Sequence, residues 1–451
     1  MRRAVLAILP GLGSLALALA LSGAMRPAAH ADAAPALEKR LARAIAEGKA
    51  DEAEAAIADL SKLGSRAAVD ALVEAGAKVE SYDIYARVIG GLARVENPEG
   101  IDTLCRRLRS GSDLRQRSVA AIACRDRRDE ATLLALLDVV DTPHLGLRRA
   151  AIRGLVVRRD RRAVEPLIGV LERNEKKAGA GAGIVARALR DLTGLDLASA
   201  AEWRSFWTAN GATFELPKAG GSEGAKEARA GGTSARFFGR TLDSDRIVFV
   251  IDISGSMKAK DPAPSGRPQT GGESGPFATD SRVRIDRAKA ELMKVLSTLP
   301  PHASFTIIAY SGPLMSASGQ DADWRTWVKG LSPSLVRASE ANVKRALAFV
   351  QTLEAKGETF TGNAVSSALL VEGADLIVLL SDGAPDEWIE EDGKRRKLGR
   401  DEVRARIRSA NRFARVTIDT FGFEGKDGSE PFVEFMKGVA SDSGGVYQAI
   451  D

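Results

Sequence analysis

The chain reads Arg246-Ile-Val-Phe-Val-Ile-Asp252-Ile-Ser254-Gly-Ser256-Met257 just past its midpoint. The five apolar residues before Asp252 are typical of a strand buried on both faces of a parallel sheet. The strand breaks into polar residues at its carboxyl end, and open α/β sheets bind ligands at that edge. The stretch therefore predicts both a parallel α/β fold and a candidate site.

Two later segments add oxygen-bearing side chains to this edge. Leu376 to Leu380 is a second apolar strand that Asp382 follows closely, and Thr359 lies in a short loop after Gly357. A turn at Gly255 would allow the first segment to leave the strand and aim its polar residues at one point. The candidate metal ligands are Asp252, Ser254, Ser256, Thr359 and Asp382.

Two carboxylates and three hydroxyls form a set of hard oxygen donors. Such a set suits Mg²⁺, with Mn²⁺ or Ca²⁺ as alternatives, and disfavours zinc and copper. In the simpler alternative, Asp252 and Asp382 cap helix amino termini and the hydroxyls satisfy turns.

At these residues the chain resembles the von Willebrand factor A domain and its metal-ion-dependent adhesion site, across residues 236–451. The family's D-x-S-x-S element corresponds to residues 252–256, its threonine loop to Gly357-Glu-Thr359, and its strand-ending D-G to Asp382-Gly383. The loop departs from the family at Glu358, where Gly is usual, and it also offers Thr361 as a ligand beside Thr359.

The resemblance implies a doubly wound, Rossmann-like fold. It also implies a site that a protein partner completes, because the family leaves one metal position open for a partner's Glu or Asp carboxylate. The surrounding pattern fits an alternating α/β order and a mainly parallel sheet. Helices are predicted over 283–299, 341–355, 364–371 and 401–414, strands over 304–310 and 415–421, and a last helix with a closing strand over 435–447.

The N-terminal half shows recurring helical pairs. Ile89, Ile122 and Ile152 occupy the same place in three similar segments, spaced by 33 and 30 residues, and a second apolar helix follows each one. Repeats of this length indicate an α-solenoid. Residues 33–210 resemble short HEAT repeats, which would offer an extended face to a second partner.

The remaining segments predict export and a flexible connection. Residues 1–31 combine a basic start, an apolar run and Ala29-His30-Ala31, as in a cleavable signal peptide. We therefore expect a periplasmic or extracellular protein, with a membrane anchor as the alternative if the segment is not cleaved. Residues 211–235 contain mostly Gly, Ala, Lys and Glu and are predicted to be a flexible linker.

Charge and composition exclude several classes of function. Residues 101–173 hold 16 Arg and no Lys against 10 acidic residues, which we interpret as the solvated surface of the repeats. We expect no nucleic-acid partner for an exported protein. Beyond residue 31 the only histidines are His144 and His302, one in each half of the chain. A histidine-based zinc site therefore has no evident ligands and a serine triad no evident base, and we expect no enzyme.

Two questions stay open at this level. Cys105 and Cys124 fall in neighbouring predicted helices and are either paired or free. The sequence also allows two functions. The first is metal-dependent binding or adhesion through the C-terminal domain. The second is a scaffold in which the repeats are the main binding surface and the C-terminal domain serves assembly.

Overall fold

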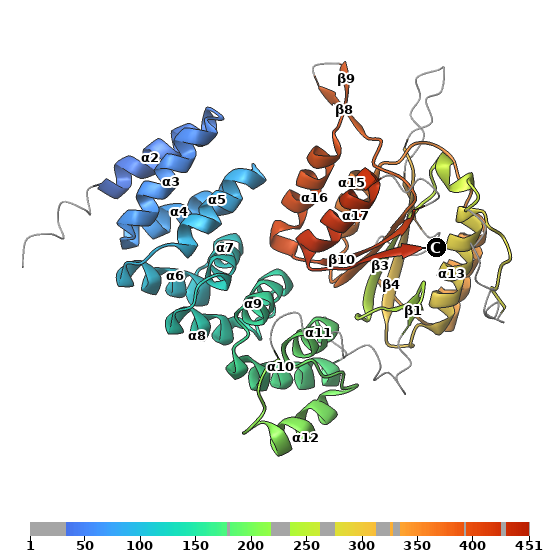
Figure 1. Cartoon of the computed structure of the whole chain (residues 1–451), viewed down its shortest axis with the longest axis horizontal. Coiled ribbons are helices and arrows are strands. Elements are labelled where there is room, and N and C mark those ends of the chain that lie inside the picture. Colours follow the sequence, from blue (N-terminus) through green and yellow to red (C-terminus); the bar gives the residue numbers. More distant parts are fainter. Residues whose placement is uncertain are drawn as a thin grey trace, which may run out of the picture.

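The computed structural model combines an N-terminal helical region with a C-terminal α/β region (Figure 1). The proposed signal peptide and most of the proposed linker lie outside the described residues. The structure describes residues 33–177, 181–217, 235–261, 276–312, 325–327, 334–391, 394–424 and 430–450.

Short polar residues start most of the N-terminal helices. Ser65, Ser81, Asn97, Asp113 and Asp129 each stand at an N-cap and accept a hydrogen bond from a backbone N–H of the first turn. These caps divide an otherwise Ala-rich sequence into short helices. The helices are α2 (Ala33–Ala46), α3 (Ala50–Leu63), α4 (Arg66–Lys78), α5 (Tyr82–Ala93), α6 (Pro98–Ser110), α7 (Leu114–Arg125), α8 (Glu130–Val139), α9 (Leu145–Arg158), α10 (Val164–Lys177), α11 (Ala182–Thr193) and α12 (Ala200–Asn210).

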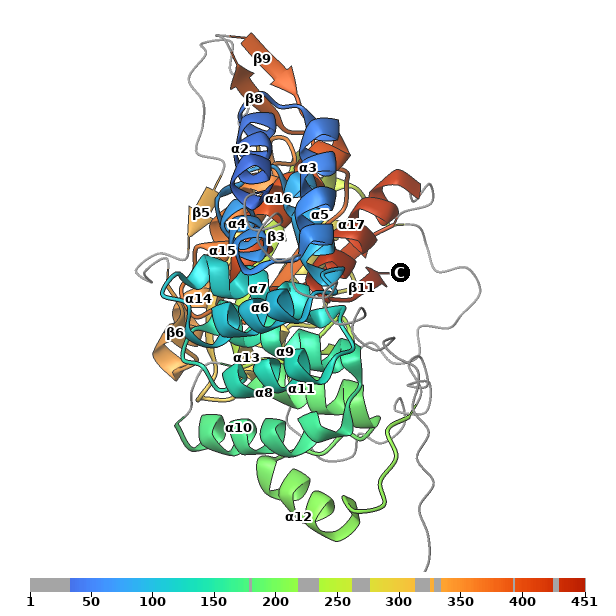
Figure 2. The same cartoon turned by 90° about the vertical axis from the view of Figure 1, so that its left-hand side faces the viewer.

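The helices stack in chain order, as Figure 2 shows from α2 and α3 down to α12. Helices α3, α5, α7, α9 and α11 contact one another in series, and α2, α4, α6 and α8 form a second series. One continuous apolar core runs between the two series. Cys105 in α6 and Cys124 in α7 are both buried and free.

Many arginines of the helical region are used within it. Buried Arg127 donates to the backbone oxygens of Ala93 and Val95 and pairs with Asp129 at 2.7 Å. Arg158 donates in turn to the backbone oxygen of Arg127. These bonds connect successive helical pairs, so part of the arginine excess of this segment has a structural use.

A seven-stranded sheet forms the centre of the α/β region, in the order β11-β10-β7-β3-β4-β5, with β6 also pairing with β4. The pairs among β11, β10, β7, β3 and β4 are parallel, whereas β5 and β6 are antiparallel. The strands are β1 (Arg236–Phe237), β2 (Arg240–Thr241), β3 (Arg246–Asp252), β4 (Ser304–Tyr310), β5 (Arg325–Trp327), β6 (Val336–Arg337), β7 (Leu376–Ser381), β8 (Trp388–Glu391), β9 (Lys394–Lys397), β10 (Thr417–Phe423) and β11 (Tyr447–Ile450).

Helices cover both faces of this sheet, as the period-two pattern of β3 requires. Ile247 and Phe249 pack on the side of α13 and α14, and Val248 and Val250 pack on the side of α15, α16 and α17. The hairpin β1–β2 adds Phe237, which is fully buried. The helices are α13 (Arg284–Thr298), α14 (Glu340–Gln351), α15 (Thr361–Leu369), α16 (Arg400–Ala414) and α17 (Glu430–Ser443).

The sequence predicts most of these elements and misses the small ones. The predicted strand over 304–310 coincides with β4, whereas the strand predicted over 415–421 begins two residues later, at Thr417. Asn411 explains the shift, because its side chain bonds both backbone groups of Val416 and holds residues 415 and 416 in a turn. The hairpins β1–β2 and β8–β9 and the antiparallel strands β5 and β6 were not expected.

The helical region packs directly against the α/β region. Arg149 of α9 forms an ion pair of 2.6 Å with Asp375, which lies just before β7, and both side chains are almost completely buried. The backbone N–H of Gly181 donates to the other oxygen of Asp375 at 2.8 Å. A Cβ at Gly146 would overlap the backbone oxygen of Phe413, so only glycine allows α9 to come this close to α16. A flexible linker alone does not lead one to expect this interface.

Candidate metal centre

The candidate site lies where the order of the sheet reverses. From β3 the chain passes through α13 to β4 on one side, whereas β7, its other neighbour, comes later and leads on to β10 and β11. The carboxyl ends of β3 and β7 therefore lie side by side while the chain leaves them in opposite directions. This topology leaves a crevice at the strand ends in open α/β sheets.

The first segment folds so that its three polar residues converge. Asp252 ends β3 and is fully buried, and its Oδ1 accepts the backbone N–H of Ser254 at 2.7 Å. A 3₁₀ turn over Gly255–Lys258 follows and brings Ser256 back toward Ser254, with 2.9 Å between the two hydroxyl oxygens. The chain therefore turns at Gly255, as the sequence predicts.

Asp382 joins the same cluster from β7. The hydroxyl of Ser256 donates to Oδ1 of Asp382 at 2.6 Å. The preceding residue, Ser381, donates to Oδ2 of Asp252 at 2.7 Å. Four of the five expected ligands therefore belong to one hydrogen-bonded group.

The threonine loop is held against this group through its backbone. The N–H of Gly255 donates to the backbone oxygen of Gly357 at 2.8 Å, and the N–H of Asp386 donates to the backbone oxygen of Thr359 at 2.8 Å. Thr359 is buried, with 6% of its surface exposed. Thr361 is the first residue of α15, and its hydroxyl lies 3.3 Å from the hydroxyl of Tyr310 in the core.

Burial and charge repulsion act together on Asp252. Removal from water, followed by the nearby charge of Asp382, raises the pKa of Asp252 to about 7. Asp382 has a cationic partner, because Nη1 of Arg284 lies 2.8 Å from its Oδ2. Arg284 also pairs with Asp261 at 2.9 Å.

Sequence reasoning misses Ser381, Arg284 and Asp261 at this site. Ser381 is a polar residue next to Asp382, and this position is a weak signal that it also belongs to the site. Arg284 lies 98 residues before Asp382, and its pairing gives no local sequence signal. Asp261 reaches Arg284 because a bridge between Lys260 and Val283 brings the two segments together.

The residues present fit a hard divalent cation. Among the described residues no group of three His, Cys, Asp or Glu side chains has metal-binding geometry, so a cation here would depend on hydroxyl as well as carboxylate oxygens. Among the described residues, the hydrogen bonds to Asp252 come from neutral donors, on Ser381 and Ser254. In addition, Oε2 of Glu358 is buried without a hydrogen-bond partner in the described part of the chain. A cation would offset the buried charge of Asp252, whereas Asp382 already pairs with Arg284.

No protein-family model matches the sequence. Inter-alpha-trypsin inhibitor heavy chain H4 from Homo sapiens is 31% identical over 159 residues, which are 33% of this chain and 13% of that protein. Heavy chain H1 from Sus scrofa is 24% identical over 173 residues, 36% of this chain and 15% of that protein. The chain thus matches only a small part of each relative.

Two solved structures are also similar. A von Willebrand factor type A structure from Catenulispora acidiphila has a TM-score of 0.31 and 20% identity, covering 46% of this chain and 38% of that chain. The pilus adhesin SpaC from Lactobacillus rhamnosus GG has a TM-score of 0.30 and 15% identity, covering 46% of this chain and 28% of that chain. The matches to the heavy chains, together with the α/β sheet, support a von Willebrand factor A domain in this chain.

Proposed function

We propose that this chain is an exported protein-binding or adhesion protein whose α/β region, residues 236–451, holds Mg²⁺ and uses it to bind an acidic partner. The observation that carries the proposal is the hydrogen-bonded group formed by Asp252, Ser254, Ser256 and Asp382 at the sheet's switch point. Thr359 would be the fifth ligand, since Thr361 contacts Tyr310 in the core instead.

The ligands favour binding over catalysis. A cation held mainly by neutral hydroxyls keeps much of its charge and so attracts a carboxylate, here a Glu or Asp of the partner. The proposal assigns no catalytic residue. Export and removal of residues 1–31 belong to the same proposal, and no helix in the described residues is long and apolar enough to cross a membrane.

The surface beside the site suits an acidic partner. The hairpin β8–β9 follows Asp382 and projects from this end of the sheet (Figure 1). Its second strand reads Lys394-Arg-Arg-Lys397, and all four residues are exposed. Arg396 also pairs with Glu391 and Glu402, and Lys397 pairs with Asp386, through exposed contacts that an acidic partner would compete with. Trp388 at its base packs edge-on against Phe360, the neighbour of Thr359, with 5.7 Å between the ring centroids. The hairpin is therefore anchored to the proposed metal loop.

Calorimetry with Mg²⁺ and Mn²⁺ tests the metal site. We expect binding in the wild type and none in Asp252→Asn or Asp382→Asn, because each change removes a charged ligand. Asp386→Asn is the matched control, since Asp386 lies in the same loop but pairs with Lys397 at 2.6 Å. Equal binding in all four proteins would rule the site out.

The threonines give a finer test of the same site. Thr359→Ala should weaken Mg²⁺ binding while leaving the apo protein about as stable as the wild type. Thr361→Ala should lower thermal stability, since it removes a buried hydroxyl contact with Tyr310, and should leave metal affinity nearly unchanged. The reverse pattern would assign the ligand to Thr361.

A groove in the helical region favours the second candidate function, a scaffold that binds protein mainly through a HEAT-like α-solenoid. The groove has a volume of about 720 Å³, and helices α2 to α5 line it with apolar residues such as Leu41 and Ile45 and charged residues such as Glu74 and Arg87. Ala42→Arg would obstruct it from an exposed position. Partner binding lost in Ala42→Arg and unaffected by a chelator would favour the scaffold, and the opposite result would favour the metal site.

A further inference from the structure

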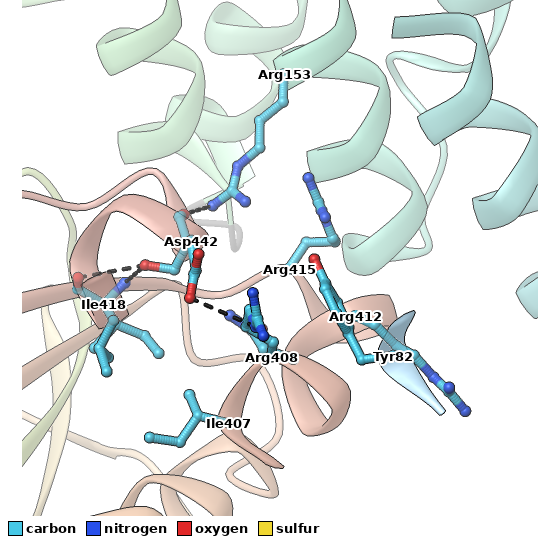
Figure 3. A pocket seen from close by; sticks show the side chains of 11 residues that line it. Tyr82, Arg153, Ile407, Arg408, Arg412, Arg415, Ile418 and Asp442 are labelled. Carbon is cyan, nitrogen blue, oxygen red and sulfur yellow. Dashed lines mark hydrogen bonds and ion pairs between the residues drawn. The ribbon is translucent and has the colours of Figure 1, made fainter. Parts of the chain in front are cut away.

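A cavity of about 310 Å³ lies between the helical region and the α/β region, at the opposite end of the sheet from the proposed metal centre. Its walls come from α9 and α11 on one side and from the starts of β7 and β10 on the other. Four arginines line it, namely Arg125, Arg153, Arg187 and Arg415. A smaller pocket shares Arg153 and Arg415, and Figure 3 shows both side chains extending into the space between the two regions.

Arg153 and Arg415 bring positive charge that no described carboxylate balances. Arg153 donates only to neutral oxygens, the hydroxyl of Thr417 at 3.3 Å and the backbone oxygen of Ser443. The Nε of Arg415 is buried without a hydrogen-bond partner among the described residues. Burial, reinforced by the neighbouring arginines, holds the pKa of Arg153 well below its ordinary value, and burial lowers that of Arg415.

Aspartates also line the cavity, but most of them already have arginine partners outside its lining. Asp243 pairs with Arg190 at 2.7 Å, Asp375 with Arg149 at 2.6 Å, and Asp442 with Arg404 at 2.6 Å. The fourth, Asp191, has its pKa raised by burial. Two of the lining arginines are also paired, Arg125 with Asp126 at 2.8 Å and Arg187 with Asp419 at 3.9 Å. The excess of positive charge in the lining therefore comes from Arg153 and Arg415, against Asp191.

Arg415 has a backbone conformation that is unfavourable for a residue with a side chain. Arg415 follows α16 in the left-handed conformation, with φ at 55°, where glycine is favoured. Arg159 has the same conformation after α9, with φ at 50°, and its guanidinium donates to the backbone oxygens of Asp191, Leu192 and Pro217. Arg159 thus gains three hydrogen bonds at such a position, whereas the described residues offer the guanidinium of Arg415 none.

We propose that this cavity binds a small phosphate-bearing molecule, whose phosphate group lies between Arg153 and Arg415. Guanidinium groups recognise phosphate oxygens through paired N–H donors. Ile152, Val156 and Ile184 line the same cavity and would accept an apolar body attached to the phosphate. Because Arg153 belongs to the helical region and Arg415 to the α/β region, the ligand would bridge the two. This site is independent of the proposed metal centre.

Inorganic phosphate is the probe for the first experiment. The full chain is titrated with sodium phosphate by calorimetry, and its melting temperature is followed against sodium chloride of equal ionic strength. We expect saturable binding and a melting temperature that rises with phosphate but not with chloride. Arg153→Met should weaken binding about tenfold or more, as expected when a hydrogen bond to a charged group is lost.

Arg415→Gly is the sharper variant, because it removes the guanidinium and relieves the left-handed backbone at once. We expect it to fold at least as well as the wild type and to lose phosphate binding. Arg128→Gln removes one exposed positive charge from the same region and should bind like the wild type. Phosphate effects that chloride reproduces, or that persist in both cavity variants, would overturn the proposal.

Discussion

At the scale of single residues, Glu387 shows how the protein positions its threonine loop. Glu387 has 1% of its surface exposed, and its carboxylate accepts the backbone N–H of Gly362 in the first turn of α15. It therefore fixes the helix that begins two residues after Thr359. Its other oxygen, Oε2, has no hydrogen-bond partner among the described residues. Burial consequently raises the pKa of Glu387 from 4.5 to about 7.

This shift predicts a pH dependence of stability. The folded state holds the proton of Glu387 more tightly than the unfolded state, so the group costs nothing below pH 4.5 and its cost grows as pH rises toward 7. Glu387→Gln stays neutral and keeps an acceptor for Gly362. At pH 8 we expect the variant to be more stable by about 2 to 3 kcal/mol, and at pH 4.5 nearly equal to the wild type.

Urea unfolding at intervals from pH 4.5 to 8 measures this effect. Glu390→Gln is the control, because Glu390 is exposed in the adjoining strand, and it should follow the wild-type profile. If Glu387→Gln also follows that profile, the carboxylate of Glu387 carries no cost in the folded protein.

At the scale of elements, the sequence predicts what depends on local periodicity. The apolar run before Asp252 and the one before Asp382 identify β3 and β7, and the order of segments places their polar ends at one edge. The approach of Ser256 to Asp382 also follows from this reasoning. The role of Arg284 does not, because an ion pair across 98 residues depends on how the segment before α13 returns to the site.

The sequence likewise does not predict the contact between α9 and α16, because Gly146 looks like a glycine that merely destabilises its helix. Gly146→Ala would normally stabilise a helix by up to about 1 kcal/mol. Here the added Cβ meets the backbone oxygen of Phe413, so we expect a net loss of about 1 to 3 kcal/mol in the free energy of unfolding of the full chain.

Gly90→Ala in α5 provides the comparison for Gly146→Ala. Its Cβ would meet only the movable end of the Arg94 side chain, at 3.3 Å. Gly90→Ala should therefore be neutral or stabilising in chemical denaturation, and a similar gain in Gly146→Ala would mean that α9 and α16 are not in close contact.

At the scale of the whole molecule, the packing of the two regions limits where partners can bind. Helices α5 and α9 contact α16, and buried Arg149 of α9 pairs with Asp375 at the amino end of β7. This face of the helical region is therefore covered by the protein's own α/β region. The groove of α2 to α5 and the proposed metal edge remain as separate candidate surfaces, so one molecule could hold two partners at once.

The Arg149–Asp375 pair tests whether this arrangement persists in solution. If the regions stay packed, Asp375→Asn leaves Arg149 buried without its counter-ion and should lower the free energy of unfolding by about 3 to 5 kcal/mol. Arg149→Met should cost a similar amount, and the double variant should cost clearly less than the sum, because the second change removes the charge that the first left unpaired. The exposed pair Arg109–Asp138 gives the scale for a surface interaction, and Asp138→Asn should cost less than about 1 kcal/mol. A linker that let the regions separate would expose Arg149 and Asp375 to water, and their variants would then behave like Asp138→Asn in denaturant titrations.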